Sequence, residues 1–188
     1  STPDDALLAK AEDGSLEQTE VLRAEVSRMI TDGRSQALAE NFAGQWLHLR
    51  DVWNIDPEYA LFPDFDEALR EAMYLESSRL FEFVIHWNHP FTDLFTAPYG
   101  FVNERLAQHY GMTGIEGDAL QWMEDGAPGR RGFLMNALWL AVTSHRGRTS
   151  PVNRGKFVLE QLLCTPPAPP PPNVEGLIDE AVDQSAPL

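Results

Sequence analysis

The chain has 188 residues, and 43% of them are hydrophobic, which is enough to bury a core as one domain or as two closely packed halves. Its 29 acidic residues outnumber 14 basic ones, so the formal net charge is −15, and this balance argues against a nucleic-acid-binding surface. The longest apolar run, Gly132–Val142, is much shorter than the roughly 20 residues that span a bilayer. A single cysteine, Cys164, excludes an internal disulfide framework and a cysteine-rich metal site.

The first half of the chain has the apolar spacing of helices. Ser15–Gln18 resembles a capping box ahead of a helix with an apolar stripe from Val21 to Ile30, and Ser35 to about Leu49 repeats the helical spacing. The second stripe is expected to pack inward. The longest helix is predicted from Asp64 to about Trp87, because acidic capping residues precede a long apolar stripe, and roughly 24 residues give about 36 Å.

The second half starts with irregular segments. Pro90–Gly100 is rich in turn residues, Asn103–Tyr110 is expected to be a short helix, and Thr113–Gly129 is rich in glycine and acidic residues, so that any hairpin there would be marginal. Gly132–Ser144 is apolar nearly all round, which predicts a central buried helix.

The C-terminal segment has clear start and stop signals. Ser150 supplies a capping oxygen and Pro151 suits a first helical turn, so a helix is predicted from about Val152 to Leu163. Six prolines within Pro166–Pro172 cannot continue it and predict an extended polyproline II strap.

These elements together predict an all-α fold, an irregular helical bundle with long loops and a C-terminal polyproline strap. A boundary near Gly126–Arg130, where an acidic glycine-rich stretch meets basic residues, divides the chain into a helical domain over residues 1–126 and a helical hairpin with the strap over residues 127–188. We expect the two parts to pack as one unit.

Four stretches of the sequence carry a resemblance to known proteins. They are Phe42–Leu47, Leu61–Leu69, Phe101–Gly111, and the series of Ser144–His145, Arg148–Pro151 and Arg154–Lys156 before the prolines. They resemble the paired domains of unknown function fifteen ninety-two and fifteen eighty-eight, found in large exported, cytochrome c-linked proteins of planctomycetes and related bacteria. Residues 1–126 resemble the first type, and residues 127–188 resemble the start of the second.

The resemblance implies a context for the chain. It is expected to be an internal piece of a longer exported protein, in the periplasm or at the cell surface, with a haem-attachment motif Cys-x-x-Cys-His following an acidic linker. The chain itself is then expected to hold no cofactor, and a c-type haem is expected in the downstream part. That haem domain is the expected partner, beside a protein or polysaccharide partner.

Glu76 is the weak catalytic candidate of the sequence. The stripe of the long helix places it on or beside the buried face, where a carboxylate needs a cation or several donors. One interpretation is a structural ion-pair network; the other is a general acid with a raised pKa that works with Asp64 or Asp66. The expected cationic partners are Arg105, Arg148 and Arg154.

A basic cluster surrounds the start of the last helix. His145 suits a metal, a haem iron or a proton switch, although a structural junction histidine is the alternative. Arg148 and Arg154, with Arg146 and Lys156 nearby, could hold a carboxylate, a sulfate or a haem propionate, or could neutralise acidic residues of the chain itself. His145, Arg148 and Arg154 are therefore the candidate cofactor-binding residues. No histidine spacing predicts a metal site.

The five tryptophans give a further candidate surface. Trp46 and Trp139 fall on apolar helix faces and are expected in the core, whereas Trp53, Trp87 and Trp122 are candidates for exposure and for a carbohydrate-binding surface.

Three hypotheses of function follow. The leading one is a non-catalytic scaffold or recognition module, placed upstream of a c-type haem domain, that supports electron transfer or substrate docking. The first alternative is a carboxylate-dependent enzyme that acts on an extracellular polysaccharide. The second is an acidic protein-interaction domain, whose binding would weaken at high salt because exposed charges are screened.

Overall fold

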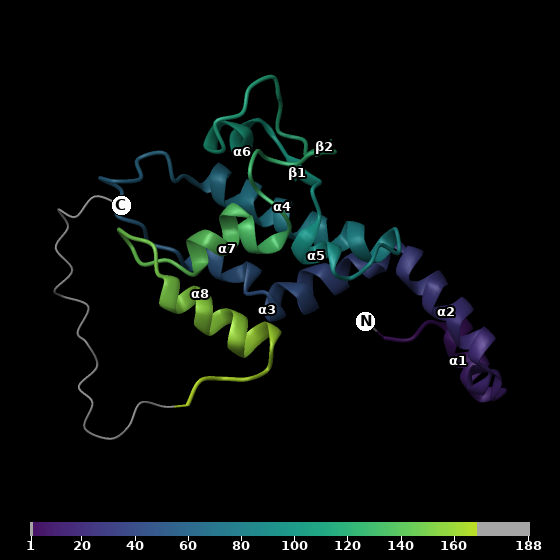
Figure 1. The fold of residues 1–188 in the computed structure, drawn as a ribbon. Helices are drawn as coiled ribbons and strands as arrows, with labels where there is room; N and C mark the ends of the chain where they lie inside the picture. Colours follow the sequence, from purple (N-terminus) through teal and green to yellow (C-terminus); the bar gives the residue numbers. More distant parts are fainter. Residues whose placement is uncertain (1, 169–188) are drawn as a thin grey trace.

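The computed structural model describes residues 2–168 (Figure 1). Two helices, α1 (Asp5–Glu12) and α2 (Thr19–Thr31), form an arm that projects from the body, and the longest helix, α4 (Glu67–His86), runs through the body. The other helices are α3 (Gly44–Trp46), α5 (Asp93–Thr96), α6 (Glu104–His109), α7 (Ala137–Val142) and α8 (Pro151–Phe157). The fold is thus mostly helical, as the sequence predicts.

Shorter helical turns link these elements. Ser15–Glu17, Gly33–Ser35, Leu49–Asn54 and Phe133–Met135 are 3-10 turns, and Leu38–Ala43 and Val158–Leu162 are π-helical. No helix among residues 2–168 is long and apolar enough to cross a membrane.

Beside its helices, the body contains a small antiparallel sheet that the sequence does not predict. Strand β1 (Gly100–Val102) pairs with β2 (Gln121–Met123), and Phe101 lies opposite Trp122. The two ring centroids are 5.3 Å apart. Aromatic cross-strand pairs of this kind stabilise sheets that are too short to persist through backbone hydrogen bonds alone.

Helix α4 is positioned by its N-terminal cap. The Asp66 carboxylate accepts a hydrogen bond of 2.7 Å from the Leu69 amide, and the Asp66 backbone is extended, so the helix starts after Asp66 and not at Asp64. Its 20 residues give a length of about 30 Å. The buried face carries Leu69, Met73, Leu80 and Val84, together with Glu76.

The predicted continuous helix over Gly132–Ser144 is wrong. Gly132 has φ +57, and a Cβ added to it would lie 2.2 Å from the Phe95 carbonyl carbon; the chain can make this turn only with glycine. A 3-10 turn follows, Asn136 is extended with ψ 147, and α7 begins only after it. The predicted burial is confirmed, because Leu138 and Trp139 belong to the core.

The start of the last helix is confirmed. The Ser150 hydroxyl accepts a hydrogen bond from the Asn153 amide at 3.2 Å, and Pro151 occupies the first turn of α8. The helix changes to π-helical geometry after Phe157. Most of the predicted polyproline strap lies outside the described residues, which reach Ala168.

The apolar stripes of the first half do not mark its buried side. On α2, Leu22 and Val26 are each 48% exposed, whereas Glu25 is only 3% exposed. Glu25 is held by Lys10 at 2.5 Å and by Arg28 at 2.8 Å, so an ion-pair network joins α1 to α2 along the side that the apolar pattern did not mark. In the segment Leu38–Ala43, Ala39 and Ala43 are buried in place of Leu38 and Phe42.

Candidate basic cleft

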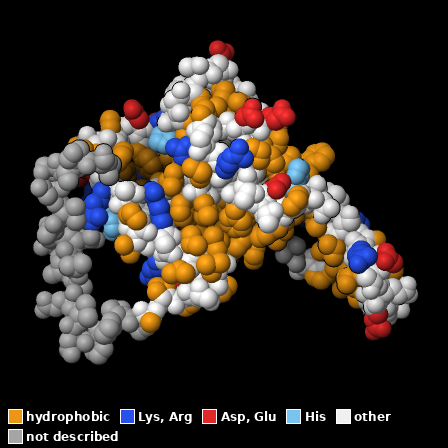
Figure 2. Space-filling model, viewed as in Figure 1, with side chains coloured by type: hydrophobic (Ala, Val, Ile, Leu, Met, Phe, Trp, Pro, Cys, Tyr) orange, Lys and Arg blue, Asp and Glu red, His pale blue; other side chains and the backbone are white. Residues whose placement is uncertain are grey.

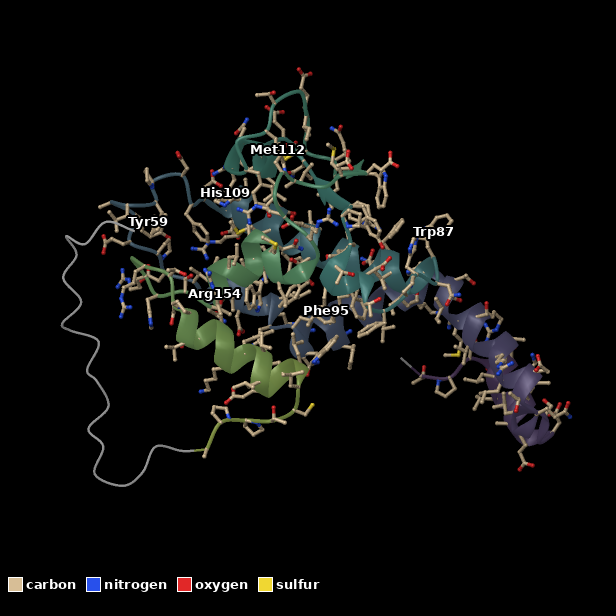
Figure 3. The ribbon with its side chains drawn as sticks, in the orientation of Figure 1. Tyr59, Trp87, Phe95, His109, Met112 and Arg154 are labelled. Atoms are coloured by element: carbon tan, nitrogen blue, oxygen red, sulfur yellow. The ribbon has the colours of Figure 1, made fainter. Side chains whose placement is uncertain are left out.

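A cleft of about 750 Å³ lies between α7, the start of α8, the end of α6 and the loop that follows Asp51. Its charged and imidazole lining gives it a basic character in a chain whose net charge is −15. We call it the basic cleft. Its lining includes Arg130, Arg146, Arg148, Arg154, His109 and His145, which face Asp51 and Asp56. Lys and Arg side chains gather beside α8 in Figure 2, and Figure 3 labels His109 and Arg154.

A tight turn between His145 and Arg148 places basic side chains at the edge of the cleft. The His145 amide donates to the Arg148 carbonyl at 2.9 Å, and the Glu58 amide donates to the Arg146 carbonyl at 2.9 Å. Gly147 lies against Leu61, where an added Cβ would be 3.5 Å from the leucine methyl. The turn is therefore fastened to the preceding loop, and its side chains His145, Arg146 and Arg148 are exposed. The Arg146 guanidinium pairs with Asp56 at 3.0 Å.

Two further arginines are fixed by aromatic rings. The Arg130 guanidinium carbon lies 4.3 Å from the centroid of the Tyr110 ring, and its Nη1 donates to the Met135 carbonyl at 2.6 Å. The Arg154 guanidinium lies 5.9 Å from the Trp139 ring. Such cation–π contacts orient a guanidinium while its charge still acts on the cleft.

The Nε atom of Arg154 lies inside the protein and not in the cleft. It is buried and has no hydrogen-bond partner among the described residues. Buried donors are satisfied in the great majority of native structures, and a donor on a charged group is the costliest to leave unpaired. The Nε1 atom of Trp139 is buried and unpartnered in the same way, so both donors lie inside the protein, where an anion in the cleft does not reach them.

Glu76 lies behind the cleft, against Tyr110. The Tyr110 hydroxyl donates its proton to the carboxyl group, with Oη 2.9 Å from Oε1 and 2.8 Å from Oε2, and accepts a hydrogen bond of 2.9 Å from the Ala137 amide. Desolvation raises the pKa of Glu76 to about 8, against the smaller opposing effects of the Tyr110 hydrogen bond, the Arg130 charge and the Ala137 amide. Burial therefore favours the protonated form of the carboxyl group.

The predicted burial of Glu76 is confirmed, since it is 5% exposed, but its expected pairing with Arg105 is wrong. Arg105 binds the Asp66 carboxylate at 3.2 Å, at the start of α4. Asp66 precedes Glu76 by ten helical residues, or about 15 Å, whereas paired glycosidase carboxyls are about 5 to 9.5 Å apart. The structure therefore does not bring Asp66 to Glu76 as a second catalytic carboxyl group.

Desolvation acts to raise the pKa of Asp66, but the Leu69 amide and Arg105 outweigh it, and that pKa is lowered. At the cleft, desolvation and the charges of Arg130 and Arg105 lower the pKa of His109, which favours the neutral imidazole. No group of three or more metal-ligating side chains is found among residues 2–168.

The structure brings the three predicted cofactor-binding residues, His145, Arg148 and Arg154, together in the basic cleft. Sequence reasoning missed Arg130, His109 and Tyr110, which come from distant parts of the chain. Lys156 does not line the cleft, and its ammonium lies 3.8 Å from Glu160. Trp53, Trp87 and Trp122 are exposed and Trp139 is buried, as predicted.

Comparison with protein-family models identifies the family of the chain. Residues 1–112 match the family model described as protein of unknown function (DUF1592), short name PSD4, which covers more than half of the chain. The chain belongs to this family. Residues 130–187 match the model described as protein of unknown function (DUF1588), short name PSCyt3, and these names point to a cytochrome c-linked context. Searches of the curated proteins and of the solved structures give no match.

A c-type haem is attached through two cysteines and a histidine ligand, and this chain contains one cysteine. Its residues therefore do not fit covalent haem attachment.

Proposed function

We propose that the chain is a non-catalytic docking module of a larger exported protein, placed upstream of a c-type haem domain, and that the basic cleft receives an anionic group of that domain. The carboxylates of a haem domain, including haem propionates, have the chemistry that arginine forks bind. The module would then hold the haem domain in a fixed position for electron transfer or for substrate docking.

The observation that carries this proposal is the gathering of four arginines in one cleft of a chain whose net charge is −15; they are Arg130, Arg146, Arg148 and Arg154. A recognition site in an acidic chain needs such a local reversal of charge to select an anionic partner. The two family matches, one of which has a cytochrome name, support the identity of that partner.

Glu76 has no part in this function as a catalyst. Its carboxyl group is buried and bound to Tyr110, and its role is to support the ring on which Arg130 lies. The enzyme hypothesis would need a second carboxyl group near Glu76, and Asp66 is not in that position.

The test uses the full-length native protein and its variant Arg130→Gln/Arg154→Gln. If the cleft holds the haem domain, removing two positive charges near the haem stabilises its oxidised form and lowers the midpoint potential, by on the order of tens of millivolts. Redox potentiometry followed by absorbance measures this shift. Arg79→Gln, on an exposed face of α4 outside the cleft, is the matched control and should leave the potential unchanged. Equal potentials in all three proteins would refute docking at this cleft.

A further inference from the structure

A second groove, of about 1020 Å³, runs along the exposed face of α4 between the end of α2 and the segment that leads into β2. It shares no lining residue with the basic cleft. We call it the aromatic groove, because Trp87 and Trp122 line it and remain 71% and 45% exposed. Figure 3 shows Trp87 at the end of α4, pointing away from the body. Two exposed indoles in one groove are more typical of a binding site than of a contact that stabilises the fold.

The indole of Trp122 is held rigidly. Its centroid lies 4.7 Å from that of Phe83 and 4.8 Å from that of Tyr99, and Phe101 contacts it edge-on. The Tyr99 hydroxyl donates to the Asp93 carboxylate at 3.0 Å, which fixes the outer ring of this stack. A ligand that stacks on Trp122 therefore meets a preformed platform and loses little affinity to side-chain ordering.

The polar lining contains both donors and acceptors. Arg79 pairs with Glu82 at 2.8 Å. His86 lies with Nδ1 3.1 Å from the Glu82 carbonyl and Nε2 2.9 Å from the Ser35 hydroxyl. Because a carbonyl oxygen can only accept, Nδ1 carries a proton, whereas the contact between Nε2 and the Ser35 hydroxyl can run in either direction.

The charged residues of the groove exclude some classes of ligand. The groove is lined by one arginine, Arg79, and by two acidic residues, Glu82 and Asp118. It therefore has no excess of positive charge to attract an anionic polymer. A wholly apolar partner would desolvate the Arg79–Glu82 pair without replacing its hydrogen bonds to water, which is costly. A quaternary ammonium would need several open ring faces around it, but of the aromatic rings that line the groove only those of Trp87 and Trp122 are exposed.

A neutral sugar chain satisfies all of these conditions. Its pyranose rings have apolar C–H faces that stack on indoles, and hydroxyl groups at their edges that both donate and accept hydrogen bonds. We propose that the aromatic groove binds a neutral polysaccharide with equatorial hydroxyls, with Trp87 and Trp122 as stacking residues and Arg79 and Glu82 as hydroxyl partners. This inference does not depend on the haem-docking function of the basic cleft.

The test is isothermal titration of the 188-residue chain with cellohexaose, xylohexaose and chitohexaose. We expect saturable binding of at least one of them, weakened about tenfold or more by Trp122→Ala and by Trp87→Ala, as for aromatic residues that dominate an interface. Trp53→Ala is the matched control, because Trp53 is 43% exposed and lies outside the groove. Its affinity should equal that of the wild type.

The Trp87→Ala variant provides a test that does not depend on whether Trp122→Ala folds. It caps the end of α4 and is largely exposed, so Trp87→Ala should retain the far-UV circular dichroism of the wild type even if Trp122→Ala does not. Absence of binding of all three sugars at millimolar concentration would overturn the proposal. So would equal affinity of the wild type and Trp87→Ala, or binding that is lost in Arg154→Gln and retained in Trp87→Ala, which would place the sugar in the basic cleft.

Discussion

The pH dependence of stability should carry the signature of Glu76. Below the ordinary pKa of 4.5, the folded and unfolded chains both hold a protonated carboxyl group at this position, and Glu76 does not destabilise the fold. Between 4.5 and about 8 the unfolded chain loses this proton while the folded chain keeps it. The folded state binds more protons in this range, so its stability falls as the pH rises and the loss is complete above the folded pKa.

The magnitude follows from the shift. Each pKa unit corresponds to about 1.4 kcal/mol, and Glu76→Gln removes the titration while an amide can still bind the Tyr110 hydroxyl. The free energy of unfolding of the variant, relative to the wild type, should therefore rise by about 3 kcal/mol between about pH 5 and about pH 8. Other titrating groups cancel in this difference because both proteins contain them.

Urea unfolding followed by circular dichroism, at both pH values, measures the effect. Glu71→Gln is the matched control, since Glu71 is an exposed carboxylate on the same helix, and its difference from the wild type should not change with pH. A Glu76→Gln effect that is equally independent of pH would mean that Glu76 is ionised in the folded protein. The reasoning from desolvation would then be refuted.

Two glycines and one cap give further predictions. Gly132→Ala should destabilise the fold by about 3 kcal/mol or more, because φ is +57 and the added Cβ meets the Phe95 backbone. Gly155→Ala should stabilise it by about 0.5 to 1 kcal/mol, since an added Cβ meets nothing within 4 Å inside α8. Thermal unfolding of both variants checks the pair, and equal effects would contradict it. Ser150→Ala should cost about 1 kcal/mol through loss of the α8 cap, and Ser150→Thr should retain most of that stability; a neutral alanine variant in urea unfolding would show that the cap is not needed.

Local signals in the sequence predict where two of the helices begin. The caps at Asp66 and Ser150 depend on residues within three positions, so the starts of α4 and α8 can be read with small error. The burial of Glu76 and the exposure of Trp87 and Trp122 also follow from position on a helix or loop. These predictions need no knowledge of distant contacts.

Contacts between distant segments account for what sequence reasoning missed. The helix over Gly132–Ser144 is interrupted because Gly132 meets Phe95 and because Asn136 donates to Ser77 Oγ at 3.3 Å, and neither contact is visible as a pattern. Glu25 is buried because Lys10 reaches it from another helix. The basic cluster near α8 could be read from the sequence, but the packing of Tyr110 on Glu76 and of Arg130 on Tyr110 joins residues far apart in the chain.

The central claim is that this module serves a c-type haem domain. The most direct test is the reduced pyridine haemochrome spectrum of the full-length native protein, which reports covalently attached haem. We expect the band of a c-type haem, retained after acid–acetone extraction of free haem. A spectrum without that band would contradict the haem-docking function and would leave the basic cleft to a different anionic partner.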